Sequence, residues 1–301
     1  MSANVPFNTP CIIGLGEILW DMLPSGTFLG GAPANFAFHA NQLGARGHVV
    51  SAVGNDDRGQ GIVDALGQLG LTTVGLRRVP HPTSTVTVTT VDGQPSYTIH
   101  TDVAWDFLPF DDELKKLAQQ ADAVCFGSLA QRSPGSRHSL QSFLRATRQD
   151  CCRVFDINLR QHYYDTATIQ ESLALSHVLK LNHEELPIVA DLLKLPSDPD
   201  STIRELLQRY GLRLVALTRG GDGSSLCNKW RVSHHPGHRV EQVADTVGAG
   251  DSFTAALVMG LLHQDDLDVI HDRAARLASF VCTQRGATPR IPDGLRSKLV
   301  G

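Results

Sequence analysis

Residues 245–251 read DTVGAGD, and an apolar run, SFTAAL, follows them directly at 252–257. Small residues let backbone N–H groups approach an anion closely, and the first turn of a following helix adds unpaired donors and partial positive charge. The stretch therefore predicts a phosphate-binding loop at the start of a helix. Asp251 places a carboxylate beside that anion site, which suits a general base in phosphoryl transfer. A helix-capping role for Asp251 is the structural alternative.

A second glycine-rich stretch lies far upstream, where residues 30–37 read GGAPANFA and Leu43-Gly44 closes the helix expected after them. In this order, the two motifs resemble the N-terminal and C-terminal signatures of the PfkB (ribokinase-like) sugar and nucleoside kinases, and the resemblance covers essentially the whole chain. It implies an α/β fold, a ribokinase-like three-layer sandwich with a mostly parallel central sheet and a small β lid. It also implies an enzyme that uses ATP and Mg²⁺.

The composition of the chain limits the classes of partner that it could bind. The chain has 301 residues and a formal net charge of −4, with acidic and basic residues interspersed, so we expect one domain and no nucleic acid or membrane partner. Residues 1–10 carry no Lys or Arg, and the apolar stretch 255–262 is far shorter than the roughly 20 residues that cross a bilayer. The six cysteines lack C-x-x-C spacing and indicate a reducing compartment. We therefore expect a cytoplasmic protein that acts on a small molecule.

Strand-like apolar runs alternate with segments of helical period, which predicts βαβ units and a parallel sheet covered on both faces. One region breaks the alternation: residues 83–91 are rich in Thr and Val, Asp92-Gly93 is a strong hairpin signal, and β character resumes at 97–101. We interpret it as a lid inserted in the single domain 1–301, at about 22–30 and 76–107. An ordinary edge hairpin is the alternative. In the family such a lid covers the sugar, and here it is also a candidate homodimer surface.

The resemblance implies the residues that handle the transferred phosphate. Asp251 is the expected base, and the backbone of Gly248, Ala249 and Gly250 would stabilise developing charge. Arg160 ends the Asp-x-Asn-x-Arg stretch at 156–160 and resembles the arginine that the family places against the phosphoryl group, where a planar guanidinium binds two oxygens. No Walker A sequence is present, so amides, Mg²⁺ and Arg160 must meet the phosphate charge.

For the sugar, Asp21 lies in GEILWDMLP at 16–24, a stretch similar to the opening of bacterial fructokinases, in which the aspartate accepts hydrogen bonds from sugar hydroxyls. Glu17 could be the ligand instead of Asp21, or either residue could cap a turn. Tyr97 and Phe107 could pack an aromatic ring on the sugar or only on the lid. The full set of expected substrate contacts is Asp21, Gly30, Gly31, Asn35, Tyr97, Phe107, Asn158, Arg160 and Asp251.

For the nucleotide and the metals, the resemblance again supplies the assignments. ATP would lie against Asn182, Thr218, Gly220, Gly223, Gly248 and Gly250. Residues 182–185 resemble the family's Asn-x-x-Glu motif, so Asn182 and Glu185 would hold Mg²⁺ through water, with Glu184 the alternative to Glu185. Asp245, Val247 and Gly286 would surround a monovalent cation such as K⁺, although carbonyl ligands leave no signature in a sequence.

Together these features predict an ATP-dependent sugar kinase that phosphorylates a primary hydroxyl. The segments at 16–24, 104–106, 126–132 and 156–160 are similar to those of bacterial fructokinases, and this resemblance favours fructose. Ribose, 2-keto-3-deoxygluconate and nucleosides are alternatives within the family. A non-catalytic sugar or nucleotide sensor is the alternative from another class. A Rossmann dehydrogenase fails because Gly14-Leu15-Gly16 is followed by Glu17, Ile18 and Leu19 and not by a G-x-G-x-x-G turn.

Overall fold

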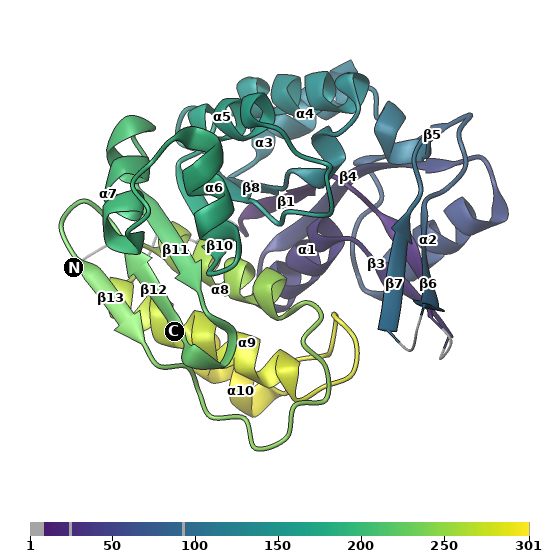
Figure 1. Cartoon of the computed structure of the whole chain (residues 1–301). Coiled ribbons are helices and arrows are strands. Elements are labelled where there is room, and N and C mark those ends of the chain that lie inside the picture. The colour runs from purple at the N-terminus through teal and green to yellow at the C-terminus, as the bar shows by residue number, and fades with distance from the viewer. Residues whose placement is uncertain (1–8, 24–25, 92–93, 301) are drawn as a thin grey trace, which may run out of the picture.

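A large twisted sheet forms the centre of the molecule (Figure 1). The computed structural model describes residues 9–23, 26–91 and 94–300, and for residues 88–91 and 94–97 it describes only the backbone. In spatial order, the nine strands that these residues form are β13 (Val232–His235), β12 (Ser224–Cys227), β11 (Leu214–Thr218), β10 (Val178–Asn182), β9 (Cys152–Asp156), β8 (Ala123–Phe126), β1 (Cys11–Leu15), β4 (Arg46–Gly54) and β5 (Leu76–Val79). The strands from β11 to β5 run parallel, whereas β12 pairs antiparallel with β11 on one side and with β13 on the other.

Helices cover both faces of this sheet, because successive side chains of a buried strand point to opposite sides. Ile12 of β1 belongs to the core on one face and Ile13 to the core on the other, and both are fully buried. The first layer contains α1 (Ala32–Gln42), α2 (Asp57–Gln68), α8 (Ala249–His263), α9 (Leu267–Cys282) and α10 (Asp293–Leu299). The second contains α3 (Asp112–Gln120), α4 (Pro134–Ala146), α5 (Thr166–Ala174), α6 (Glu185–Leu193) and α7 (Pro199–Arg209). The predicted three-layer α/β sandwich is therefore confirmed.

Local sequence signals set where many of these helices begin. An aspartate accepts a hydrogen bond from a backbone N–H of the first turn in five described helices, and such a cap stabilises a helix by about 1 kcal/mol. These caps are Asp56 of α2, Asp111 of α3, Asp165 of α5, Asp198 of α7 and Asp266 of α9. Proline lies in the first turn of α1, α4 and α7, where its missing N–H costs no hydrogen bond. Among the helices described, none combines the length and apolar character needed to cross a membrane.

A second, smaller sheet stands beside the first, with strand order β3 (Gly26–Gly30), β2 (Leu19–Leu23), β6 (Thr85–Val91) and β7 (Gln94–Ile99). It is found at the right of Figure 1. The strands of this small sheet differ from the ranges expected for the lid. β2 begins at Leu19, before the expected start at about 22, and β5, which lies within the expected range 76–107, pairs with β4 of the large sheet. The expected turn at Asp92-Gly93 lies outside the described residues. The two strands on either side of it, β6 and β7, pair antiparallel.

The strand order places one edge of the large sheet in a special position. The carboxyl ends of β1, β9, β10 and β11 all lie at this edge because the strands are parallel. In open α/β sheets, ligands bind at that edge. From β1 to β11 there are four strand spacings of about 4.8 Å, so the edge offers roughly 19 Å of length.

Candidate active site

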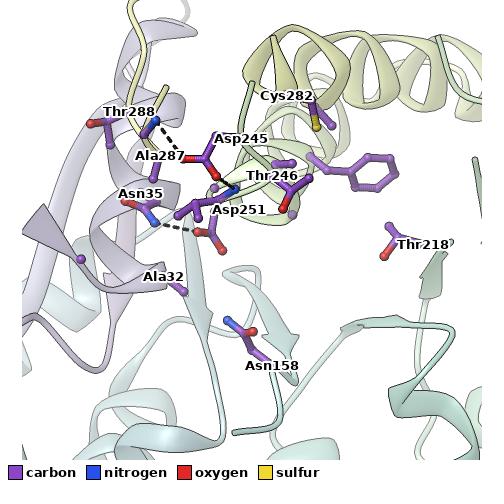
Figure 2. Close-up of a pocket in the computed structure, with 18 of the residues that line it drawn as sticks. Ala32, Asn35, Asn158, Thr218, Asp245, Thr246, Asp251, Cys282, Ala287 and Thr288 are labelled. Carbon is purple, nitrogen blue, oxygen red and sulfur yellow. Dashed lines mark hydrogen bonds between the residues drawn. The ribbon is translucent and has the colours of Figure 1, made fainter. Parts of the chain in front are cut away.

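One long cleft of about 2470 Å³ runs along this edge. At one end, which we call the small-sheet end, it is lined by Asp21, Gly30, Gly31 and Asn35. At the other end, the turn end, it is lined by Thr218, Gly220 and Gly223. Figure 2 shows Asn35 and Thr218 on opposite sides of Asp251. The cleft therefore has room for two ligands placed end to end, with Asp251 between them.

The loop predicted to bind phosphate forms the N-terminus of α8. Gly248 precedes the helix with φ of 78°, a left-handed conformation that favours glycine. A Cβ at Gly248 would also lie 2.6 Å from the carbonyl oxygen of Ala287, so the close approach of the two loops requires glycine. The N–H of Ala249 donates to Thr246 at 3.3 Å. In the described hydrogen-bond network, the N–H groups of Gly248 and Gly250 have no protein acceptor, which leaves them available to an anion.

Asp251 lies in the first turn of α8, partly buried in the cleft. Its Oδ2 accepts a hydrogen bond of 2.8 Å from the Nδ2 of Asn35 in α1 (Figure 2). Burial raises the pKa of Asp251 to about 6 and nearby Asp156 adds to the rise, whereas Asn35, Lys180 and Arg160 act to lower it. A carboxylate with this pKa is ionised at neutral pH and is still a usable proton acceptor.

A buried ion pair lies against the loop that begins α8. Its cation, Lys180, was not predicted from the sequence. The Nζ of Lys180 in β10 lies 3.0 Å from Oδ1 of Asp156 in β9. The other carboxylate oxygen accepts a 2.9 Å bond from Thr254 of α8, whose hydroxyl is also 3.0 Å from the carbonyl of Gly250. A Cβ at Gly250 would be 2.9 Å from Lys180 Nζ, so the ammonium group lies directly against the loop. The available signal was a single lysine inside an otherwise apolar strand.

The small-sheet end depends on two glycines. A Cβ at Gly30 would overlap Oδ2 of Asp21, so glycine at this position leaves the carboxylate in place across the β2–β3 pair. Gly31, with φ of 117°, lets α1 begin against the carbonyl of Glu17, which a Cβ would approach to 2.6 Å. Burial raises the pKa of Asp21. The structure thus brings Asp21, Gly30, Gly31 and Asn35 together.

Asn158 and Arg160 follow β9 and line the middle of the cleft. Asn158 has φ of 47°, which asparagine tolerates better than most residues, and this turn carries the chain past the end of β9. The exposed guanidinium of Arg160 donates to the carbonyl of Leu159 at 3.0 Å and acts to lower the pKa of Asp251. Both residues therefore line the cleft, and their contacts with sugar and phosphate stay predictions.

The two predicted aromatic contacts have different outcomes. The side chain of Tyr97 lies outside the described residues. Phe107 is 39% exposed and stacks on His81, with ring centroids 3.4 Å apart, and the described residues that line the cleft do not include it. The neighbouring segment is structural: buried Asp106 pairs with Arg132 at 2.7 Å, and the guanidinium of Arg132 lies 3.9 Å from the Trp105 ring centroid. This network joins the segments 104–106 and 126–132.

The turn end has a tight turn that follows β11. Gly220 and Gly223 both have positive φ, and a Cβ at Gly223 would overlap the carbonyl of His235. Thr218 ends β11 and lines the cleft, as do both glycines. Residues 236–240, which follow β13, line the same end of the cleft.

The residues predicted to hold Mg²⁺ are engaged in backbone hydrogen bonds. Oδ1 of Asn182 accepts from the N–H groups of Glu184 and Glu185, each at 2.9 Å. The buried carboxylate of Glu185 accepts from Leu159 at 2.9 Å and from Asn182 at 2.8 Å. Glu184 is exposed and lines the cleft. These residues fit a hydrated cation through water, with Glu184 as the carboxylate that faces it, and they do not fit direct ligation by Glu185.

Asp245, Val247 and Gly286, the residues predicted around a monovalent cation, also meet in space. Oδ1 of Asp245 accepts from the N–H of Val247 at 3.0 Å, and Oδ2 accepts from the N–H of Gly286 at 3.2 Å. The bonds tie the loop before α8 to the loop after α9. Carbonyl oxygens at these loops are the ligands that a hard monovalent cation would use.

In the described part of the chain, one group of three side chains could hold a metal, namely His235, His238 and Asp272. Its hydrogen bonds indicate a different role. Nδ1 of His235 accepts from the N–H of Gly237, so Nε2 of the neutral ring carries the proton and donates to Asp272. Asp272 is also held by Arg276 at 3.1 Å. The group is a hydrogen-bonded cluster at the turn end.

The chain is similar to known proteins over most of its length. Residues 26–294 match the family model of the pfkB family carbohydrate kinases. The chain is 30% identical over 297 residues to a fructokinase of Escherichia coli, covering 92% of this chain and 95% of that protein. Among solved structures, fructokinase with bound ATP from Xylella fastidiosa has a TM-score of 0.83 and 24% identity, covering 96% and 98% of the two chains. A Burkholderia thailandensis nucleoside kinase in complex with inosine has a TM-score of 0.78 and 21% identity, covering 97% and 96%.

The chain therefore belongs to the pfkB family of carbohydrate kinases and is an ATP-dependent enzyme of that class. This confirms the family and the activity class expected from the two glycine motifs. A sensor that has lost catalysis does not agree with this result.

Proposed function

We propose that this kinase transfers the γ-phosphoryl group of MgATP to a primary hydroxyl of a free sugar, and that the sugar is fructose. The observation that carries the proposal is the position of Asp251. It lies between the two ends of the cleft, beside the free N–H groups that begin α8, and is oriented by Asn35 at 2.8 Å. This position supports a proposal in which a base, an anion site and a polar sugar pocket meet at one point.

In the proposed reaction, the sugar binds at the small-sheet end and the nucleotide at the turn end. The carboxylate of Asp251 takes the proton of the sugar hydroxyl, and the oxygen of that hydroxyl forms a bond to the γ-phosphorus. The bond from that phosphorus to the β,γ-bridging oxygen breaks, and ADP leaves with the electron pair. The amides of Gly248 and Gly250, the Lys180 ammonium below them and the Arg160 guanidinium stabilise charge on the phosphoryl oxygens.

The cations of the proposal fit the same cleft. When bound to the phosphates, Mg²⁺ would draw negative charge from the γ-phosphoryl group, and Glu184, Asn182 and Glu185 would order its water. A potassium ion beside Asp245, Val247 and Gly286 would hold the loop before α8 in its anion-binding shape. Both cations are part of the proposal.

Charge at the small-sheet end favours an uncharged substrate. Glu17, Asp21 and Asp251 line this part of the cleft, Arg160 lines it as well, and Lys180 is paired with Asp156. A sugar phosphate or a keto-deoxy acid would bring another negative charge to this surface. The fructokinases among the relatives then support fructose over ribose.

We extend the proposal to the small sheet, which would act as a lid over the sugar and as the surface of a homodimer. Phe28 on β3 is exposed, lines the cleft and lies opposite Asp21 in the β2–β3 pair, which supports a small sheet with one face over the sugar. A cytoplasmic location agrees with six free cysteines, five of which are buried.

The test is an ADP-release screen with purified protein, MgATP and equal concentrations of ketoses, aldoses, 2-keto-3-deoxygluconate, fructose 6-phosphate and nucleosides. We expect fructose to have the highest kcat/KM. A higher value for ribose, a nucleoside or a phosphorylated sugar would refute the fructose assignment, and no ADP release with any acceptor would refute phosphorylation of a small molecule.

A further inference from the structure

Glu17 lies in the turn between β1 and β2 and takes no part in the reaction described above. Its side chain is 6% exposed and lines the small-sheet end of the cleft. Its backbone is fixed, because the carbonyl oxygen packs against Gly31, where a Cβ would come within 2.6 Å of it. The carboxyl group is therefore held beside the glycine motif and not free in solvent.

The hydrogen bonds of Glu17 are incomplete. Its Oε2 is buried and has no partner among the described residues. Glu185 provides a comparison within the same cleft edge: it is also 6% exposed, but both of its oxygens accept backbone N–H bonds, at 2.9 and 2.8 Å. A buried acceptor without a partner costs about 1–3 kcal/mol. Both oxygens of Glu185 have partners whereas Oε2 of Glu17 has none, which indicates that the partner of this oxygen arrives with a ligand.

A second unpaired acceptor points the same way. The Nδ2 of Asn35 is bound to Asp251, whereas its Oδ1 is buried without a partner among the described residues. Glu17 and Asp251 also share the wall of a small adjoining cavity of about 10 Å³, which has room for roughly one water molecule and no more. A larger donor must come from the main cleft.

The charge around Glu17 selects the kind of donor. Burial raises the pKa of Glu17 to about 7 and the charge of Asp251 adds to the rise, whereas the backbone N–H groups of Glu17 and Ala32 and the charge of Arg160 act to lower it. An anionic ligand group would face both carboxyl groups. A hydroxyl group suits them, because it can donate to the ionised form of Glu17 and can accept from its neutral form.

We propose that Glu17 binds a second hydroxyl group of the sugar, close to the one that Asp251 deprotonates, and that this contact selects polyhydroxyl substrates. The inference rests on the proposed function and adds a specificity residue to it. Asp21 and Asn35 would bind other hydroxyl groups of the same sugar. Glu17 and Asp21 are then not alternatives, as the sequence suggested, but act together.

The test is a cycle between variants of Glu17 and deoxy analogues of the substrate. Values of kcat/KM are measured for the wild type, Glu17→Gln and Glu17→Ala with fructose and with its monodeoxy analogues. We expect Glu17→Ala to lower kcat/KM for fructose about 10- to 100-fold, which corresponds to the loss of a hydrogen bond to a charged group. Glu17→Gln, which keeps an acceptor oxygen, should lose less.

The decisive result is the pattern across the analogues. For the one analogue that lacks the hydroxyl bound by Glu17, the Glu17→Ala substitution should lower kcat/KM less than threefold. KM for ATP should stay within twofold of the wild type. Equal losses for every analogue would overturn the proposal, because Glu17 would then act through the fold or through a trapped water. The surface variant Glu241→Ala and thermal unfolding of every variant control for damage to the fold.

The wild-type series tests the proposed function separately. If the wild type phosphorylates another sugar and not fructose, the fructose assignment fails while the same cycle on deoxy analogues of that sugar still tests Glu17. If Glu17 shows no coupling to any hydroxyl of an accepted sugar, the inference is refuted and the assignment of kinase activity still stands.

Discussion

Replacing Asp251 by asparagine should lower activity and raise stability at the same time. Asparagine keeps an oxygen that can accept the hydrogen bond from Asn35, but it cannot take the sugar proton. Loss of a general base typically costs 10²- to 10⁴-fold, so kcat should fall by roughly that factor. KM for both substrates should change little, because the shape of the cleft is retained.

The expected gain in stability follows from the raised pKa. Asp251 has a pKa of about 6 in the folded protein against 3.8 for an unperturbed aspartate, so the folded state binds the proton more tightly. The free energy of unfolding therefore falls as pH rises from about 4 to about 6, and the penalty is complete above that range. Because the side chain is only partly buried, we expect a penalty on the order of 2 kcal/mol at pH 7.5, which asparagine removes.

Two assays test this reasoning. A coupled ADP assay gives kcat and KM, and thermal unfolding at pH 7.5 and pH 4.5 should show the variant more stable than the wild type at the higher pH, with the difference reduced at the lower pH. In the wild type, kcat/KM should fall about tenfold per pH unit below 6. The surface variant Asp191→Asn should change neither quantity. Retention of more than a third of wild-type kcat by Asp251→Asn, or a loss of stability at pH 7.5, would refute the assignment of Asp251 as a desolvated base.

Three further outcomes are expected. Asp21→Ala should raise KM for fructose about 5- to 100-fold and leave KM for ATP unchanged in the same kinetic assay, and equal weakening of both would indicate a folding defect. Lys180→Met should lower the free energy of unfolding in urea by about 3–5 kcal/mol, because it leaves the buried carboxylate of Asp156 without its cation, and a loss below 1 kcal/mol would contradict the ion pair. Turnover in KCl should exceed turnover in tetramethylammonium chloride severalfold at equal ionic strength and saturating Mg²⁺, and equal rates would rule out the cation beside Asp245.

The sequence by itself determined the parts of the site whose geometry is local. The loop at 248–251 and the glycines at 30–31 need particular backbone angles and small side chains, and such requirements are written in consecutive residues. Alternating apolar and helical segments likewise predicted a parallel sheet between two helical layers, because the periodicity of burial depends on each segment alone. The family and the three-layer fold were confirmed for these reasons.

Only the tertiary structure decided which side chains meet across the sheet. Lys180 and Asp156 pair because β9 and β10 are neighbours, and no local pattern specifies that order. Glu185 is bound to backbone N–H groups, and Phe107 lies against His81 outside the cleft, although both residue types suited a ligand. A side chain takes the partner that its three-dimensional neighbours offer. Short motifs therefore suggested the residues of the proposed reacting centre, whereas the ion pair beside it and the unpaired Oε2 of Glu17 emerged from packing.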